Sequence, residues 1–525
     1  MKKVLSLVTI LMASLVLVAC GSNQNNYFDG LTEPFNENLF YRNDLDVRVA
    51  DPSIIYITEG ADAGYFYLYG TTDQLSATGV YAYRTKNFND WQLMGPAFVP
   101  HKDAWGISSI WAPEVIYMDG QYYMYYSATN RFNDNLKGLG VAVSDHPAGP
   151  FEVYSGTTID NREITVSDQP FDVGFKSIDV SPFIDSNGDF YIYFSKDMVD
   201  GISSVWGVKM LDPVTPDMDT LKQLTQPSFR SVEAFNNAVL RFGDISWEHS
   251  NDVQGYVMWN EGPYMYEKDG TYFLSYSANP YWSREYAVGY AIADSPLGDF
   301  VKPEDNRILG VDDNWDHMSG TGHHVFFKVG TELFIAYHAH TDRVFGNSSR
   351  AVAIDRVFID GETLYINGPT YSIQPLPEMV TGYRNIALEA QITATNGDAV
   401  NKLNDSIVAM HLKDAETQMY VENGQTTITF TFDTEQTVRA ILIYNSVDYE
   451  TAFFNVDAID VSSEIKIRNL GFNSLYINTE FPDFPEMRPG GSFLAEFNET
   501  MTNQIVITIN SDGPISIPEI FILGK

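Results

Sequence analysis

Cysteine and positive charge are both scarce in this chain. Only Cys20 of its 525 residues is a cysteine, which excludes an internal disulfide and a metal site built from thiolates. Lys and Arg number 32 against 69 Asp and Glu, giving a formal net charge of −37 at pH 7. Nucleic acids and anionic membrane surfaces would repel such a chain, so neither is an expected partner. Neutral polymers and divalent cations are compatible with this charge.

Long apolar runs are also lacking, except at the N-terminus. There two lysines precede the run VLSLVTILMASLVLV, which is followed by the small residue Ala19 and then Cys20. This arrangement resembles the signal of bacterial lipoproteins, in which the cysteine is lipidated. It predicts a signal peptide over residues 1–19, a polar tether over 20–38 and a lipid-anchored protein of the bacterial cell envelope. An ordinary signal peptide with an incidental cysteine is the alternative interpretation.

A pattern of apolar strand, turn and aromatic strand recurs five times in the following two-thirds of the chain. The copies read DPSIIYITEGADAGYFYLYG, APEVIYMDGQYYMYYS, SPFIDSNGDFYIYFS, EGPYMYEKDGTYFLSYS and GHHVFFKVGTELFIAYH. Several of their turns are Asn-Gly or Asp-Gly, which favour tight β-hairpins. Further short strands follow each hairpin, so the pattern predicts a five-bladed β-propeller over residues 39–378. An array of β-sandwiches with generic hairpins is the alternative.

Acidic residues and one histidine stand at or just before the openings of these copies. They are Asp51, Glu114, Asp179, Glu261 and His323. A radial fold brings equivalent positions of successive units to a common axis. The repeat therefore predicts one central site lined by carboxylates, with no catalytic role assigned to Glu114.

A second domain is expected after a boundary near residues 375–385. Short alternating strands continue there without acid-bearing openings, and they predict a β-sandwich over residues 384–525. Its opening, NIALEAQITATNGDAVNKLND, resembles discoidin-like domains, which are commonly sugar-binding modules. A structural cap on the propeller is an equally acceptable interpretation.

Converging carboxylates in an aromatic-lined cleft suit the hydrolysis of glycosidic bonds, where one activates water and another protonates the leaving oxygen. Asp51 begins a strand beside the VADPS turn, which suits an ionised base. Glu261 lies between Trp259 and Pro263, a partly apolar setting that raises the pKa of a carboxyl group. A negative charge on Asp179 would raise the pKa of Glu261 further.

The motifs DPS, SIDVSPFID, EGPYMYEKDG and GTGHH, with NFNDWQLMGPAF and WAPEV, resemble glycoside hydrolase family 43 over about residues 40–375. The resemblance implies a five-bladed propeller and an inverting mechanism. By the motif match, Asp51 is the general base, Asp179 the pKa modulator and Glu261 the general acid. The chain departs from the family at Val180, where proline is frequent, and at Glu114, where aspartate is common.

The same resemblance implies a cation, usually calcium, on the propeller axis near His323, and no organic cofactor. One imidazole among waters makes a weak calcium site, because calcium prefers oxygen ligands. A transition-metal cluster of His317, His338 and His340 is disfavoured by their spacing. Arg350 resembles the family arginine that reaches the substrate, with Arg343 as the rival residue.

Sugar contacts are expected from Trp111 and Trp259, which adjoin motif residues, although each aromatic is equally suited to packing. The family resemblance implies an oligo- or polysaccharide substrate. Release of terminal or side-chain α-L-arabinofuranose is the first expectation, followed by β-D-xylosidase activity. A non-catalytic glycan-binding lipoprotein is an alternative of another class. A retaining fructan-type enzyme is disfavoured, since the NDPNG and RDP motifs are absent. We expect a monomer that meets the membrane only through its lipid.

Overall fold

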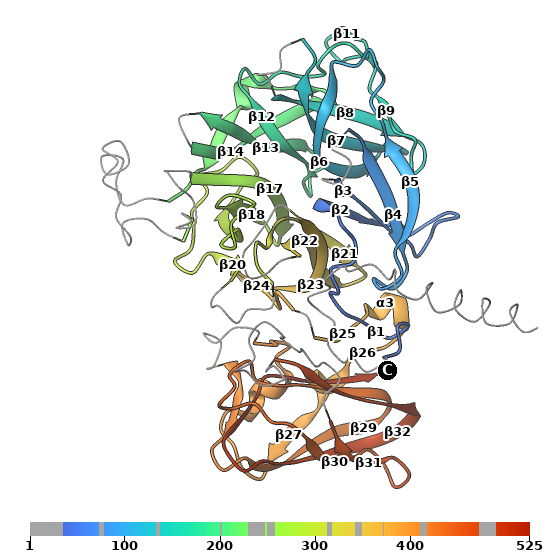
Figure 1. Cartoon of the computed structure of the whole chain (residues 1–525), viewed down its shortest axis with the longest axis vertical. Coiled ribbons are helices and arrows are strands. Elements are labelled where there is room, and N and C mark those ends of the chain that lie inside the picture. The colour runs from blue at the N-terminus through green and yellow to red at the C-terminus, as the bar shows by residue number, and fades with distance from the viewer. Residues whose placement is uncertain are drawn as a thin grey trace, which may run out of the picture.

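A computed structural model describes most of the chain from residue 35 onward (Figure 1). The described residues are 35–72, 78–132, 137–199, 202–228, 247–248, 258–311, 318–341, 349–370, 372–409, 417–471 and 490–525. Nearly all of their regular structure is β-strand. The expected all-β fold, a five-bladed propeller followed by a β-sandwich, is confirmed. Cys20, His317 and Arg343 lie outside the described residues.

Five groups of antiparallel strands form the blades of the propeller, and a short parallel pairing joins blades three and four into one continuous sheet. Blade one contains β2 (Ala50–Tyr56), β3 (Phe66–Thr71), β4 (Val80–Thr85) and β5 (Gln92–Phe98), and blade two contains β6 (Gly106–Met118), β7 (Gln121–Asn130), β8 (Lys137–Ser144) and β9 (Glu152–Val153). Blade three contains β12 (Ser177–Ile184), β13 (Phe190–Val199), β14 (Ile202–Asp212), β15 (Thr215–Pro216) and β16 (Lys222–Thr225). Blade four contains β17 (Met258–Lys268), β18 (Thr271–Ala278), β19 (Ala287–Ala293) and β20 (Arg307–Leu309). Blade five contains β21 (Gly322–Val329), β22 (Glu332–His340), β23 (Arg350–Asp360) and β24 (Thr363–Ile366).

The hairpin turns form where the sequence predicts them. Asp119 and Gly120 between β6 and β7 have φ of 51° and 85°, and Asp269 and Gly270 between β17 and β18 have φ of 53° and 84°. Two successive positive φ values are the signature of a type I′ turn, whose twist matches that of the flanking strands. The short strands β10 (Gly156–Thr157) and β11 (Glu163–Ile164) form a separate hairpin after blade two.

The two ends of the propeller meet beside blade five. β1 (Phe40–Tyr41) pairs with β25 (Gln374–Pro375). Asp355 of β23, which is fully buried, accepts hydrogen bonds from Tyr337 at 2.6 Å and from Gln374 at 2.8 Å. Burial raises the pKa of Asp355 to about 8, against the opposing effect of these donors. The closure of the ring therefore depends on a buried polar network as well as on strand pairing.

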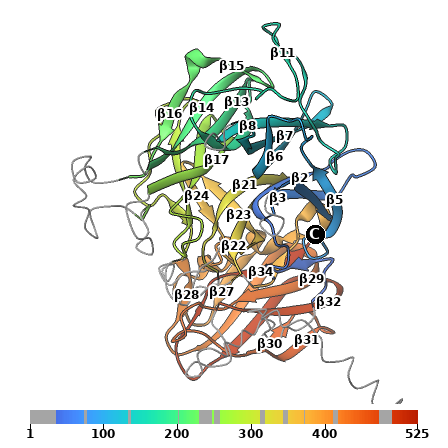
Figure 2. The same cartoon turned by 45° about the horizontal axis from the view of Figure 1, so that its top comes forward.

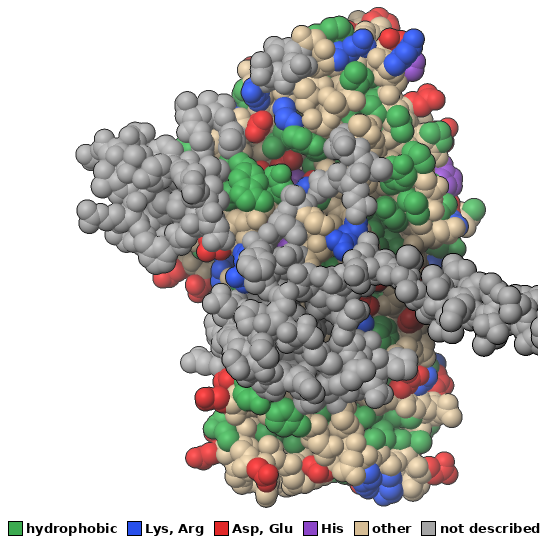
Figure 3. All heavy atoms as spheres, viewed as in Figure 1, with side chains coloured by type: hydrophobic (Ala, Val, Ile, Leu, Met, Phe, Trp, Pro, Cys, Tyr) green, Lys and Arg blue, Asp and Glu red, His purple; other side chains and the backbone are tan. Residues whose placement is uncertain are grey.

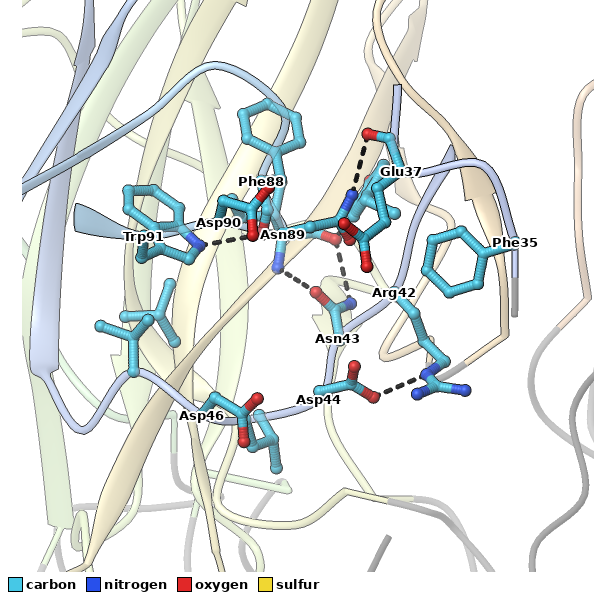
Figure 4. Close-up of a pocket in the computed structure, with 15 residues that line it drawn as sticks. Phe35, Glu37, Arg42, Asn43, Asp44, Asp46, Phe88, Asn89, Asp90 and Trp91 are labelled. Carbon is cyan, nitrogen blue, oxygen red and sulfur yellow. Dashed lines mark hydrogen bonds and ion pairs between the residues drawn. The ribbon is translucent and has the colours of Figure 1, made fainter. Parts of the chain in front are cut away.

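A pocket of about 300 Å³ lies next to this closure, between the segment around β1 and blades one and five (Figure 4). Its walls carry Asp44, Asp46 and Asp90, and Arg42 pairs with Asp44 at 2.6 Å. Burial, followed by the neighbouring charge of Asp44, raises the pKa of Asp46. None of the expected catalytic acids lines this pocket.

The C-terminal sandwich is built around two long strands. β29 (Gln425–Tyr444) and β32 (Ser492–Asn510) belong to a seven-stranded sheet that also contains β26 (Arg384–Asn385), β27 (Gln391–Ala394), β30 (Val456–Asp460), β31 (Lys466–Leu470) and β34 (Ile520–Gly524). β28 (Met419–Val421) and β33 (Ile515–Ile517) form a second, two-stranded sheet. The interior is almost purely aliphatic and aromatic, including Ile428, Phe430 and Ile507. The short helices of the chain include α3 (Glu378–Thr381), η2 (Met218–Thr220), η3 (Ile386–Glu389) and η4 (Val400–Asn404). No helix in the described part of the chain has the length and apolar character needed to cross a membrane.

The sandwich packs against the outer part of the propeller rather than its centre (Figures 1 and 2). Leu364 and Ile373 of the propeller share one buried apolar cluster with Leu442 and Phe521 of the sandwich. Tyr444 adds a hydrogen bond from its hydroxyl to the carbonyl oxygen of Ile373 at 2.9 Å. A shared core of this kind fixes the two domains against each other.

Candidate active site

The innermost strand of every blade has the same local irregularity. β2, β6, β12, β17 and β21 each show a register shift against the next strand of their blade. Within each shift one residue adopts a positive φ, between 43° and 59°: Asp51, Ala112, Asp179, Gly262 and His323. A bulge of this type bends the strand and re-aims its side chains. Four of these residues are not glycine, so the surrounding fold stabilises an unfavourable backbone conformation.

Hydrogen bonds between neighbouring blades hold these bulges. The amide N–H groups of Ala112, Asp179 and His323 donate to Thr71, Ser127 and Ser277, at 2.7–2.8 Å. Each acceptor is a hydroxyl near the end of the second strand of the preceding blade. In blade one the amide of Asp51 donates instead to Nδ1 of His338, at 3.2 Å, and so closes the ring. The fifth amide, of Gly262, donates to the carboxylate of Asp179 at 3.1 Å.

The register corrects one expected equivalence. Blade two has Ala112 at its bulge, whereas Glu114 lies two residues further along β6 and pairs with Tyr125 of β7. Its carboxylate accepts a hydrogen bond from Ser181 at 3.2 Å, and burial raises its pKa well above the usual value. All five strands have the same bulge, so Glu114 corresponds to Ser53 and Ser181, which lie two residues beyond Asp51 and Asp179, and not to the acids themselves.

Asp51 is almost fully buried, with 7% of its surface exposed, and it is surrounded by basic groups. Its Oδ1 lies 2.9 Å from Nη1 of Arg350, 3.3 Å from Nδ1 of His323 and 3.4 Å from Nδ1 of His338. Burial alone would raise the pKa of Asp51, but Arg350, His323 and His338 together hold it well below its usual value. Asp51 is therefore ionised across the range in which proteins normally work.

Asp179 occupies the equivalent bulge of blade three, and fewer groups stabilise its carboxylate than stabilise that of Asp51. Its Oδ2 accepts the amide of Gly262 at 3.1 Å and lies 3.5 Å from the hydroxyl of Ser195. Burial raises its pKa, His323 lowers it, and the negative charge of Asp51 raises it again. The net effect is an increase, so the charge of Asp179 depends on the ionisation of its neighbours.

Glu261 precedes the bulge of blade four and is also buried, with 8% of its surface exposed. Its pKa lies well above the usual value because of burial and then the negative charge of Asp179, while a hydrogen bond from Tyr286 opposes this shift. Glu261 is thus held protonated close to an ionised Asp51. Two carboxyl groups with opposite pKa shifts are what an acid and a base require in one site.

The family model of glycosyl hydrolases family 43 matches residues 44–363 of this chain, well over half of its length. The chain belongs to glycosyl hydrolase family 43. A solved structure of a thermostable family-43 glycoside hydrolase is 31% identical, with a TM-score of 0.53 over 64% of this chain and 99% of that one.

Curated relatives of this family 43 chain have several different activities. A xylosidase/arabinosidase of Bacteroides ovatus is 24% identical over 45% of this chain and 65% of its own length. An extracellular exo-alpha-(1->5)-L-arabinofuranosidase of Streptomyces avermitilis is 25% identical over 52% and 49%. A beta-D-galactofuranosidase of Aspergillus niger is 27% identical over 47% and 59%. The chain thus spans between about half and two-thirds of the length of these relatives.

Arg350 of the family 43 chain contacts the expected base directly. Besides its ion pair with Asp51, its guanidinium lies over the ring of Tyr281, 4.6 Å from the centroid. Tyr281 belongs to the loop between β18 and β19, whose next residue, Trp282, is 42% exposed. The ring of Trp282 meets that of Trp259 edge-on at 5.2 Å, and Trp259 itself is only 7% exposed. Trp282 therefore presents more surface to a ligand than Trp259 does.

Trp111 occupies in blade two the position that Glu261 occupies in blade four, directly before the bulge. Nζ of Lys137 lies 2.9 Å from the centroid of its ring. Burial lowers the pKa of Lys137 to about 8, against attraction from Asp197 and Asp179. Trp111 thus lies on the central face with a cation against its ring. In Figure 3, Asp or Glu side chains are recessed near the middle of the propeller.

The expected calcium ligand His323 is directed toward the site, since its Nδ1 is 3.3 Å from Asp51. Among the described residues, no three His, Cys, Asp or Glu side chains are grouped as they would be around a metal ion. This donor set fits only an accessory ion that His323 and water hold. His324 is buried, and its Nε2 bonds to Ser275 at 2.7 Å, as expected of a packing residue.

Sequence reasoning missed two residues of the site, His338 and Tyr286. His338 is the last residue of the fifth copy of the repeat, at the position where the other blades have Thr or Ser, and this difference was the available signal. Tyr286 lies in a loop, and no motif marks it. The glycines of GTGHH explain part of the arrangement, because a Cβ at Gly320 would meet the ring of His340 and one at Gly322 would meet Tyr286.

Proposed function

We propose that this protein is an inverting glycoside hydrolase that releases terminal or side-chain α-L-arabinofuranose from plant-type glycans. One observation carries the proposal: Asp51 and Glu261 meet at one site with pKa values shifted in opposite directions. Membership of family 43 supports the reaction class, and relatives named for arabinofuranoside hydrolysis support the sugar. Asp51 is the general base, Glu261 the general acid and Asp179 the modulator of the pKa of Glu261.

The proposed reaction is a single displacement. Asp51 takes a proton from a water molecule as that water attacks the anomeric carbon. The bond between that carbon and the glycosidic oxygen breaks, and Glu261 gives its proton to the departing oxygen. The configuration inverts because the water and the leaving group lie on opposite faces of the sugar ring. Asp51 then loses a proton to solvent and Glu261 regains one.

The test is hydrolysis of nitrophenyl α-L-arabinofuranoside, β-D-xyloside and β-D-galactofuranoside, with the product anomer followed by NMR. We expect the fastest turnover on the arabinofuranoside and an inverted first product. Faster xyloside hydrolysis would favour β-xylosidase activity, the second candidate, which the xylosidase/arabinosidase relative supports. If folded protein hydrolyses none of them or of the corresponding oligosaccharides, the enzymatic proposal is wrong. Binding without hydrolysis would then favour a glycan-binding lipoprotein.

We further propose that Cys20 is lipidated and anchors the protein to the bacterial cell envelope. The full-length protein should partition with membranes, and Cys20→Ser should release it to the soluble fraction.

Calcium near His323 is proposed as an accessory ion that orders water and adds positive charge beside Asp51. Chelation should reduce turnover, and added calcium should restore it. Glycan binding by the sandwich is tested by affinity electrophoresis in arabinan.

A further inference from the structure

Tyr286 links the two sides of the site that carry the proposed base and acid. Its hydroxyl donates a hydrogen bond to Oε1 of Glu261 at 2.9 Å. Its ring stacks on the imidazole of His338, with centroids 5.4 Å apart and an angle of 9° between the planes. Nδ1 of His338 in turn accepts the amide N–H of Asp51. Tyr286 and His338 are both completely buried, so this chain of contacts is shielded from solvent.

The fold holds Tyr286 from several directions. Its amide donates to the carbonyl oxygen of Ser283 at 3.1 Å, which closes the turn before β19. Gly322 of β21 lies against its ring, and a Cβ at that position would collide with the ring. The ring is therefore clamped between blade four and blade five. A side chain fixed in this way has little freedom to rotate away from Glu261.

The hydrogen bond distinguishes the two oxygens of Glu261. In a protonated carboxyl group one oxygen carries the proton and the other is the better acceptor. Because the Tyr286 hydroxyl donates to Oε1, the proton of Glu261 is placed on Oε2. Burial and the charges of Glu261, Asp51 and Asp179 raise the pKa of Tyr286 well above its usual value. Tyr286 consequently remains a donor wherever the enzyme works.

We propose that Tyr286 is a positioning residue that directs the catalytic proton of Glu261 to Oε2, a role that rests on the proposed function. When Glu261 transfers that proton to the glycosidic oxygen, the same hydrogen bond stabilises the carboxylate that remains. His338 completes the arrangement on the other side. Its Nδ1 lies 3.2 Å from the amide nitrogen and 3.4 Å from Oδ1 of Asp51, and burial lowers its pKa to about 3.

The test compares Tyr286→Phe with the parent protein. Removing the donor destabilises the ionised form of Glu261, so the alkaline limb of the kcat/KM profile should move upward by about one pH unit. Turnover should fall about tenfold with oligosaccharides, whose leaving group needs the proton. It should fall much less with nitrophenyl glycosides, whose leaving group departs without one.

Tyr193→Phe is the matched control. Tyr193 is also fully buried, and its hydroxyl donates one hydrogen bond, to the carbonyl oxygen of Pro296 at 3.0 Å. The substitution removes this bond, but Tyr193 does not touch the acids. It should lower the unfolding temperature to a similar extent while leaving the pH profile and the leaving-group dependence unchanged. Gly322→Ala provides a second variant, because it keeps the hydroxyl but displaces the ring and should shift the alkaline limb in the same direction.

An unchanged alkaline limb and an unchanged leaving-group dependence in folded Tyr286→Phe would overturn the proposal. If Tyr286→Phe does not fold, the same result in Gly322→Ala overturns it. An inactive parent protein would instead contradict the proposed function itself, so the two failures are distinguishable.

Discussion

The two sides of the site, which carry the proposed base Asp51 and the proposed acid Glu261, are built alike, but the pKa values of these two residues are shifted in opposite directions. Asp51 and Glu261 come from the innermost strands of two blades, at or beside the same bulge, and both are more than nine-tenths buried. Burial by itself raises the pKa of both carboxyl groups. Arg350 and two histidines reverse the shift at Asp51, whereas Asp179 reinforces it at Glu261. The propeller thus supplies neighbouring positions at equivalent bulges, and the adjacent blade sets the direction of the pKa shift of each acid.

The largest expected effect is a loss of kcat, which should depend on the leaving group when Glu261 is replaced but not when Asp51 is replaced. Asp51→Asn should reduce kcat by roughly 10²–10⁴-fold on every substrate, because attack by water always needs a base. Glu261→Gln should cause a comparable loss only with oligosaccharides, since nitrophenolate leaves without a proton. Turnover of both substrate types by both variants measures the contrast. Equal leaving-group dependence in the two variants would contradict the assigned roles.

Loss of the Arg350 guanidinium beside Asp51 should reduce the difference in pKa between Asp51 and Glu261. Arg350→Met removes the guanidinium 2.9 Å from Asp51, so the pKa of Asp51 should rise by about one unit or more. The base works only when it is ionised. The fall in activity on acidification should therefore begin at a higher pH in the variant than in the parent protein. The acidic limb of kcat/KM against pH measures this shift. Arg350→Lys keeps a charge and should move the limb less; an unmoved limb in Arg350→Met would show that Arg350 does not control the base.

A smaller change is expected on the acid side. Asp179→Asn removes the negative charge that raises the pKa of Glu261 and retains an oxygen for the amide of Gly262. Glu261 works only when protonated, so the alkaline limb should move downward by about one pH unit. The acidic limb, set by Asp51, should move little. An upward shift of the alkaline limb would contradict the role of Asp179 as a modulator.

Much of this site could be predicted from one sequence. The recurring strand pairs predicted the blades, and the acids at their openings predicted which side chains meet at the axis. Arg350 was expected to reach a substrate, and the structure places it on Asp51. Glu114 was expected at a position equivalent to the acids, but it lies two residues beyond the bulge of its strand, where blades one and three have Ser53 and Ser181. Which residue of each strand forms the bulge depends on strand pairing, which the sequence repeat does not show.

The sequence by itself determined the all-β architecture and predicted the domain order and the three acids of the proposed site, because these depend on local patterns of strand, turn and charge. Only the tertiary structure decided the environment of each acid. Tyr286 and His338 come from different blades, and the glycine that admits the Tyr286 ring lies 36 residues further along the chain. A pKa depends on distances of a few ångströms between such groups, and only folding sets those distances.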